Sequence, residues 1–281
     1  MLNEESIKRY LLPLTPLPTN TDPFGTIDTG TMCILFDIYG TLFISGSGDI
    51  GMSKSNVQNL SKLERLLTKY RIPGPARNLL EVFFKQIEAE HGRAKKNGVQ
   101  YPEVDIIHIW KQVLKTYETE TIRDFAIEFE MIVNPVYPMP HLAELLTTCR
   151  QKNIRMGIIS NAQFYTALLF EWFLNANLTA LGFTMELVLL SYRYGQAKPS
   201  ELLFQQAVDQ LKDLGIHPRS VLYLGNDMLN DIYPAHTVGF QTALFAGDAR
   251  SLRLRKNDPR CRDLSADLVI TDLLQLVDLL C

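Results

Sequence analysis

The sequence predicts an α/β protein in which a three-layer core with a parallel sheet carries a second, all-helical domain. Short apolar runs alternate with helical patterns after residue 140, and this alternation is typical of a parallel sheet with helices on both faces. From about residue 54 to 133, apolar residues instead recur at helical spacing, with no convincing strand. Polar residues follow several of the predicted strands, at the position where such sheets carry their sites.

The composition excludes several classes of protein. The 281 residues include 46% hydrophobic residues, which is ordinary for a chain that buries a core. A net charge of −3, with both signs spread along the chain, argues against a nucleic acid or a membrane surface as partner. No apolar run reaches the roughly 18 residues of a membrane span, and the first residues lack the basic and apolar regions of a secretory signal.

The four cysteines are scattered without a C-x-x-C pair, which favours reduced thiols over a metal cluster or a disulfide framework. We therefore expect a cytoplasmic protein that acts on a small-molecule substrate. The sequence leaves the choice between a monomer and a homodimer open.

The first part of the core is expected over residues 32–45, after an N-terminal extension of residues 1–31. Leu12 to Asn20 reads LPLTPLPTN, a composition that predicts irregular structure. Met32 to Asp37 reads MCILFD, an apolar run ended by a carboxylate. Such a run is typical of a strand buried on both faces of a parallel sheet.

The helical domain is predicted over residues 46–135. Leu60, Leu63 and Leu67 fall on one helical face, and similar periodicity recurs in later stretches that prolines separate. The rest of the core follows over residues 136–281, where strands and helices alternate. The predicted strands are 154–159, 187–190, 220–224, 241–245 and 267–270, and the predicted helices are 141–152, 162–174, 200–214, 231–238 and 272–280.

Polar residues cluster at the ends of four predicted strands, and neighbouring parallel strands bring such ends to one rim of the sheet. An Asp that ends a buried strand favours a function over a turn cap, because an unpaired buried charge is costly. In chain order the clusters are Asp37 to Leu42, Ser160-Asn161, Lys198, and Gly225-Asn226-Asp227 with Asp231.

This order resembles the haloacid dehalogenase superfamily, whose motifs run Asp-x-Asp-Gly-Thr-Leu, then Ser or Thr, then Lys, then an acidic Gly-Asp cluster. The resemblance covers about residues 31–275 and implies a Rossmann-like core with an all-helical cap domain. It implies that Asp37 is the nucleophile, that Ser160 holds a phosphoryl oxygen and that Lys198 balances charge. The catalytic residues it implies are Asp37, Tyr39, Thr41, Ser160, Asn161 and Lys198, and the Mg²⁺ ligands are Asp37, the Tyr39 carbonyl, Asn226, Asp227 and Asp231.

The chemistry of these residue types supports the same roles. A carboxylate that attacks phosphorus divides one hard displacement into two easier ones, and phosphoryl transfer needs mainly positioning and neutralisation of charge. Mg²⁺ commonly takes one or two carboxylates, and Lys198 adds a point charge. We therefore expect a Mg²⁺-dependent phosphatase that acts on a small phosphorylated metabolite through an aspartyl-phosphate.

Two positions depart from the common pattern of the superfamily and keep alternatives open. Tyr39 stands where phosphatases carry a second Asp, a general acid that is typically worth about 10²–10⁴-fold in rate. A tyrosine there resembles the metal-independent 2-haloacid dehalogenases, which would use the same Asp37. Asn226 replaces the usual first Asp of the last motif, so either Asn226 or Asp227 could bind the metal directly. Because an acid and a metal ligand are replaced, a ligand-binding protein with weak catalysis is a third alternative.

Overall fold

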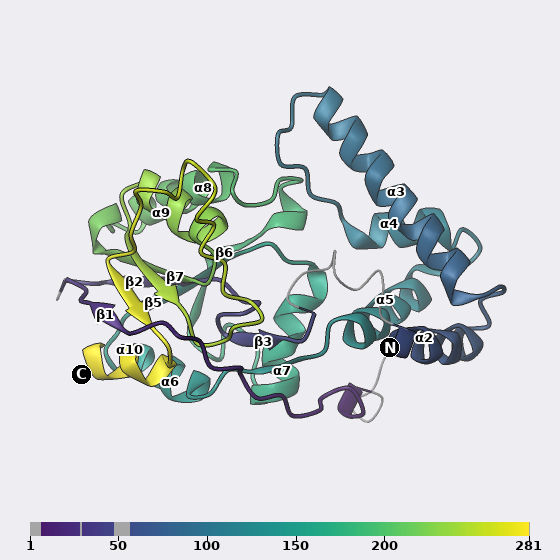
Figure 1. Ribbon diagram of the computed structural model, residues 1–281, viewed down its shortest axis with the longest axis horizontal. Helices are drawn as coiled ribbons and strands as arrows, with labels where there is room; N and C mark the ends of the chain where they lie inside the picture. The colour runs from purple at the N-terminus through teal and green to yellow at the C-terminus, as the bar shows by residue number, and fades with distance from the viewer. Residues whose placement is uncertain (1–6, 29, 48–56, 281) are drawn as a thin grey trace.

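The computed structural model describes residues 7–28, 30–47 and 57–280 (Figure 1). Within these residues a seven-stranded sheet has the order β1-β9-β8-β7-β2-β5-β6. Neighbouring strands are parallel, except that β1 and β9 run antiparallel. The predicted α/β class with a largely parallel sheet is therefore confirmed. The strands are β1 (Phe24–Gly25), β2 (Cys33–Phe36), β5 (Arg155–Ser160), β6 (Phe183–Leu190), β7 (Val221–Gly225), β8 (Gln241–Phe245) and β9 (Leu268–Ile270).

Helices cover both faces of the sheet because its central strands are apolar on both sides. In β2, Ile34 and Phe36 join the buried cluster under one set of helices, while Cys33 and Leu35 join the cluster on the opposite face. The first face carries α6 (Leu142–Gln151), α7 (Leu168–Leu174) and α10 (Leu273–Leu280), and the second carries α8 (Leu202–Asp213) and α9 (Tyr233–Thr237) (Figure 1).

A group of helices with its own core lies beside these layers (Figure 1). It consists, among the described residues, of α2 (Val57–Tyr70), α3 (Ala76–Lys96), α4 (Ile106–Val113) and α5 (Thr119–Val133). Trp110 is central to this core, where its ring stacks on Phe83 at a centroid distance of 4.2 Å and meets Phe125 and Phe129 edge-on. We call these helices the cap. They fall inside residues 46–135, and the exact limits of the domain stay a prediction.

A two-stranded ribbon that the sequence did not predict connects the cap to the core. β3 (Phe43–Ser45) pairs antiparallel with β4 (Val136–Pro138), so the chain leaves and re-enters the core along paired strands. Asn134 Oδ1 accepts hydrogen bonds of 2.9 Å from both Ser45 Oγ and Ser47 Oγ. Each strand has only three residues, which is too short for an alternating pattern to stand out.

Three predicted elements have clearly different limits in the structure. The helix predicted from about residue 162 begins as a 3₁₀ turn over Phe164–Ala167, and α7 itself begins at Leu168. β6 begins at Phe183 rather than at residue 187. The helix predicted over residues 231–238 begins earlier, with a π-helical turn over Met228–Ile232 that precedes α9. Asp227 starts this turn, because its side chain accepts hydrogen bonds from the N–H groups of Leu229 and Asn230.

The N-terminal extension is attached to both the core and the cap. Its short strand β1 lengthens the sheet next to β9, and the N–H of Leu17 donates to Asp248 Oδ1 at 3.1 Å. Further towards the N-terminus, Tyr10 Oη donates to Glu128 Oε2 of α5 at 2.6 Å. None of the helices in the described part of the chain is both long and apolar enough to cross a membrane.

Candidate active site

Asp37 lies directly after β2 and lines a cavity of about 330 Å³. Its backbone N–H donates to the carbonyl of Leu224 in β7 at 2.8 Å. Its Oδ1 accepts a hydrogen bond of 2.6 Å from Lys198 Nζ, and among the described residues no hydrogen bond holds Oδ2. The side chain is only 8% exposed. Asp37 therefore presents a carboxylate with one oxygen fixed and the other available.

The loop after Asp37 touches the turn that follows β7. Gly40 has a φ of +85°, and a Cβ there would lie 2.4 Å from Ser251 Cβ and 2.7 Å from Asn226 Nδ2. Both the backbone conformation and the lack of space require glycine. Thr41 Oγ1 donates to Asn226 Oδ1 at 3.1 Å. The first and last sequence motifs are therefore in direct contact.

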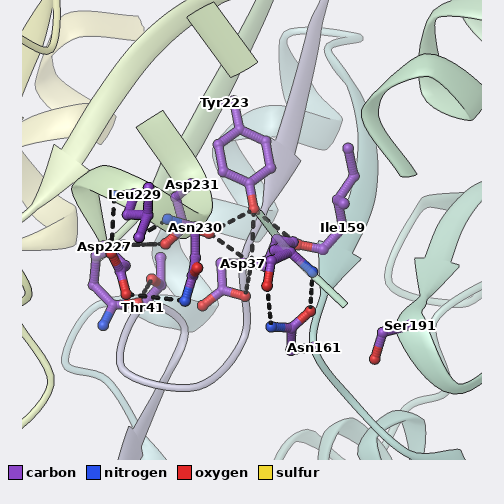
Figure 2. A network of polar contacts seen from close by, with 12 residues as sticks. Asp37, Thr41, Ile159, Asn161, Ser191, Tyr223, Asp227, Leu229, Asn230 and Asp231 are labelled. Atoms are coloured by element: carbon purple, nitrogen blue, oxygen red, sulfur yellow. Dashed lines mark hydrogen bonds and ion pairs between the residues drawn. The ribbon is translucent and has the colours of Figure 1, made fainter. Parts of the chain in front are cut away.

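Lys198 joins three of the predicted motifs. Its Nζ lies 2.6 Å from both Asp37 Oδ1 and Asp231 Oδ1. Burial opposes the ammonium charge, but Asp231 and Asp37 outweigh it and raise the pKa of Lys198 above its ordinary value. Asn161 fixes the backbone of Lys198 from both sides, because its Oδ1 accepts from the N–H at 2.7 Å and its Nδ2 donates to the carbonyl at 3.3 Å (Figure 2).

The carboxylate of Asp231 has a partner for each of its lone pairs. Oδ1 lies 2.6 Å from Lys198 Nζ and 3.1 Å from Tyr223 Oη, and Oδ2 accepts from the N–H groups of Asn226 and Asp227 at 3.0 and 2.9 Å. Figure 2 shows Tyr223, Asp37 and Asp231 converging at the ends of the strands. Burial raises the pKa of Asp231, Lys198 opposes this, and Asp37 and Asp227 add to it. Asp231 thus anchors Lys198 and the turn after β7.

Asp227 is engaged by an arginine that the sequence motifs did not include. Arg255 Nη2 lies 2.6 Å from Asp227 Oδ2, and Nε lies 3.0 Å from Oδ1. The side chain of Asn230 also donates to Oδ2, at 3.0 Å. Both oxygens of Asp227 are therefore occupied, and its charge is balanced locally.

Ser160 and Tyr39 differ in how their hydroxyl groups are satisfied. Ser160 ends β5, is fully buried and lines the cavity, and its Oγ has no hydrogen-bond partner within the described part of the chain. Tyr39 Oη lies 2.9 Å from Thr166 Oγ1. Burial and the nearby Glu130 raise the pKa of Tyr39 far above its usual range. The Tyr39 phenol is therefore a poor proton donor, whereas the Ser160 hydroxyl is free to bind a ligand.

The oxygens around Asp37 fit a Mg²⁺ ion with a small ligand set. Among the described residues, no group of three or more His, Cys, Asp or Glu side chains could hold a metal. Each carboxylate oxygen of Asp227 and Asp231 already has at least two partners, whereas Asn226 Oδ1 accepts only from Thr41 among the described residues. Asp37 Oδ2, Asn226 Oδ1 and the backbone carbonyl of Tyr39 are therefore the best placed oxygens. One carboxylate with neutral oxygens, water and a substrate phosphate is an ordinary environment for Mg²⁺.

Carboxylates and cations at the rim are balanced in number. The cavity lining includes Asp37, Asp227 and Asp231 together with Lys198, Arg253 and Arg255. A phosphate dianion and a divalent metal ion bound together would keep this balance.

Several residues of the site have no sequence motif. Tyr223 lies inside an apolar strand. Its presence in the sequence could have indicated a polar site nearby, because a buried tyrosine hydroxyl usually has a hydrogen-bond partner. Arg255 lies in an irregular stretch between β8 and β9. The cap contributes Glu103 and Glu130 to the cavity lining, and burial raises the pKa of both carboxyl groups.

Comparisons with known proteins agree with this architecture. A family model described as haloacid dehalogenase-like hydrolase matches residues 31–239. A ribulose-1,5-bisphosphate 5-phosphatase of Halopiger xanaduensis is 28% identical over 143 residues, which are 50% of this chain and 56% of that protein. The match therefore spans little more than half the length of that relative.

Solved structures show the same fold at low sequence identity. A 2-haloacid dehalogenase from Pseudomonas syringae pv. Tomato DC3000 superimposes with a TM-score of 0.55 and 18% identity over 89% of this chain and 98% of that chain. A HAD phosphatase from Thermococcus onnurineus gives a TM-score of 0.53 and 19% identity, again over 89% and 98% of the two chains. One structure is a dehalogenase and the other a phosphatase, so the fold does not choose between the two reactions.

Proposed function

The chain belongs to the haloacid dehalogenase-like hydrolase family, and from this premise we propose that it is a Mg²⁺-dependent phosphatase acting on a small phosphorylated metabolite. The observation that carries the proposal is the state of Asp37. Lys198 holds one carboxylate oxygen at 2.6 Å, and the other has no hydrogen bond among the described residues. A carboxylate that is oriented in a cavity with one oxygen unengaged is suited to nucleophilic attack. The phosphatase relative supports phosphorus as the electrophile.

The reaction divides into two displacements at phosphorus. In the first, Asp37 Oδ2 attacks the phosphate ester, the bond from phosphorus to the ester oxygen breaks, and that oxygen leaves and takes a proton from water. In the second, water attacks the aspartyl-phosphate, the bond from phosphorus to Asp37 breaks, and inorganic phosphate and the free carboxylate are restored. Lys198 keeps Asp37 oriented and balances charge in both steps.

The remaining core residues bind and position. Ser160 Oγ can donate to a phosphoryl oxygen, which would satisfy a buried hydroxyl that otherwise has no partner in the described chain. The N–H of Asn161 is a second donor, while the side chain of Asn161 fixes Lys198. Thr41 holds Asn226 against the loop that carries Asp37.

Mg²⁺ would be held by Asp37, Asn226 and the carbonyl of Tyr39, and it would supply positive charge to the phosphoryl oxygens. Asp231 and Asp227 would not bind the metal directly but would hold the residues around it in place. Asp231 fixes Lys198, and Asp227 holds the turn after β7 to Arg255.

Tyr39 also motivates a second candidate, a metal-independent 2-haloacid dehalogenase that uses Asp37. A 2-haloacid carries a carboxylate, which needs a cationic or hydrogen-bonding partner in the site. Glu103 and Glu130, however, line the catalytic cavity from the described part of the cap. No lysine or arginine of the described cap lines this cavity, so the described cap offers no cation to the carboxylate of a 2-haloacid, and the phosphatase is the better supported reaction.

The deciding experiment measures two activities of the purified 281-residue chain. We expect hydrolysis of 4-nitrophenyl phosphate that requires Mg²⁺, stops with EDTA and is lost in Asp37→Asn. Asp213→Asn, at an exposed position of α8, should behave like the parent and serves as the matched control. Chloride release from 2-chloropropionate that resists EDTA would replace the phosphatase with the dehalogenase. Failure of the folded protein to turn over either substrate would reject both.

A further inference from the structure

A second cavity, of about 640 Å³, lies within the cap. All of the helices α2 to α5 contribute to its lining, which is mostly apolar and aromatic and includes Leu63, Phe83, Trp110 and Phe129. Its volume is in the range of about 300–1,000 Å³ that is usual for pockets holding small organic ligands. None of the proposed catalytic residues lies in this lining.

The cap cavity borders the catalytic cavity. Glu103, Glu130, Gln163 and Tyr165 line both. Gln163 belongs to the core, yet its Nε2 donates to the carbonyl of Val104 at 2.8 Å and its Oε1 accepts from the N–H of Ile106 at 3.0 Å. Core and cap are therefore in contact where the two cavities meet. A molecule that extends from one cavity to the other would place its reacting group beside Asp37 and its remainder in the cap.

Unsatisfied polar atoms occur in the linings of both cavities. In the described part of the chain, the buried side-chain atoms without a hydrogen-bond partner are His91 Nε2, Trp110 Nε1 and Ser160 Oγ. His91 and Trp110 line the cap cavity, and Ser160 lines the catalytic cavity. Buried polar groups in native proteins are rarely left without a partner. A hydroxyl group of a ligand could supply the missing partner of His91 or Trp110, and a phosphoryl oxygen could supply that of Ser160.

We propose that the cap cavity holds the organic group of the substrate, and that this group is a large apolar ring system with few hydroxyl groups, esterified to the phosphate at Asp37. The assignment rests on the proposed phosphatase function and specifies its substrate class. Ring faces gain favourable contacts with Phe83, Trp110 and Phe129. A sugar would instead bury hydroxyl groups against hydrocarbon, and each unsatisfied hydroxyl costs free energy.

Kinetics on a series of esters test this class. We expect kcat/KM for 1-naphthyl phosphate to exceed that for phenyl phosphate by about tenfold or more, and ribulose 1,5-bisphosphate to be poorer than either. Leu80→Arg places a charge in the cavity lining at a half-buried position of α3 and should remove the preference for the naphthyl ester. Val82→Arg, on the same helix but 46% exposed and outside the lining, should keep it. Ala126→Phe, which fills the cavity from α5, provides a second test if Leu80→Arg does not unfold cooperatively.

Binding of 1-naphthol separates this inference from the reaction itself, because 1-naphthol carries no phosphate. Calorimetry should detect binding to the parent and to Asp37→Asn, and a loss of at least about tenfold in affinity in Leu80→Arg. Naphthol binding without hydrolysis of any phosphate ester would reject the phosphatase and retain the cavity as the binding site of an apolar group. Equal kcat/KM for the naphthyl and phenyl esters, with no binding of naphthol, would overturn the cavity assignment and leave the phosphatase intact.

Discussion

Arg255 holds both carboxylate oxygens of Asp227, with Nη2 lying 2.6 Å from Oδ2 and Nε lying 3.0 Å from Oδ1. A carboxylate paired in this two-point manner is not available to a metal ion without breaking charge-assisted hydrogen bonds. The affinity for Mg²⁺ should therefore depend on the neighbouring residue, Asn226, which contributes an oxygen without a charge.

Asn226→Asp should tighten Mg²⁺ binding by about tenfold, because an added carboxylate strengthens a hard-cation site. Without bound metal, the same substitution should lower the stability of the folded protein. Asn226 Nδ2 donates to the carbonyl of Ser251 at 2.6 Å, and aspartate cannot replace this donor. We expect a lower Tm in EDTA and a larger increase in Tm on addition of Mg²⁺, with affinities measured by calorimetry.

Asn230→Asp is the matched control, since it adds the same charge to the same turn. Asn230 Nδ2 donates to Asp227 Oδ2 and does not belong to the proposed ligand set. Equal tightening in both variants would show that net charge, rather than a ligand at Asn226, governs the affinity.

Lys198→Met should destabilise the fold as well as stop hydrolysis. Lys198 Nζ lies 2.6 Å from both Asp37 and Asp231, and its removal leaves two buried carboxylates without their cation. Loss of one partner of a buried ion pair typically costs about 3–5 kcal/mol. Urea unfolding should show a loss of this size, and adding Asp231→Asn should recover much of the stability without restoring activity. A double variant no more stable than Lys198→Met would contradict the electrostatic explanation.

Tyr39→Asp should change the dependence of the rate on the leaving group. Tyr39 has a strongly raised pKa and is hydrogen-bonded to Thr166, so the parent has no efficient acid at this position. A carboxyl group there could protonate the departing oxygen, which is worth about 10²-fold or more for poor leaving groups. The ratio of the rates for an alkyl phosphate and 4-nitrophenyl phosphate should rise in Tyr39→Asp. It should not rise in Tyr39→Asn, which has the same shape without the acid, and equal ratios in the two variants would refute this role.

Much of the core could be predicted because its strands are buried on both faces. An apolar run such as Cys33 to Phe36, ended by Asp37, leaves few other interpretations. The meeting of Asp37, Lys198 and Asp231 follows from the same topology, since parallel strands bring their carboxyl ends to one rim. Short elements such as β3 and β4 could not be predicted, because three residues carry too little pattern.

The hydrogen-bond partners of the site could not be predicted from the motifs. The sequence places Asp227 and Asp231 in the acidic cluster, but which donors occupy their oxygens depends on residues that are distant along the chain or carry no motif. Arg255 lies in an irregular stretch with no periodicity, and Tyr223 is hidden in an apolar strand. The acidic lining from Glu103 and Glu130 likewise depends on how the cap packs against the core.

Glu128 of α5 links the cap to the N-terminal extension through the partners of its buried carboxylate. Its side chain is fully buried, accepts hydrogen bonds from Tyr10 Oη at 2.6 Å and Tyr70 Oη at 2.7 Å, and pairs with Arg9 and Lys69. Burial alone would raise the pKa of Glu128, but the hydrogen bonds from Lys69, Tyr10 and Tyr70 lower it below its ordinary value. The carboxylate therefore stabilises the folded state while it is ionised.

Glu128→Gln should lower the free energy of unfolding at neutral pH by about 1–3 kcal/mol, because glutamine removes the charge and replaces one acceptor oxygen with a donor that faces other donors. A lowered pKa contributes stability above the unfolded value, about 4.3 for Glu, and this stability is lost as the pH falls through the lower folded value. Urea titrations should show a constant difference from the parent between about pH 5 and 8 and a smaller one below about pH 4. Glu120→Gln, at an exposed position of the same helix, should change stability by less than about 1 kcal/mol. If the difference in unfolding free energy between the parent and Glu128→Gln stays equally large below about pH 4, packing rather than the charge of Glu128 stabilises the contact between the extension and the cap.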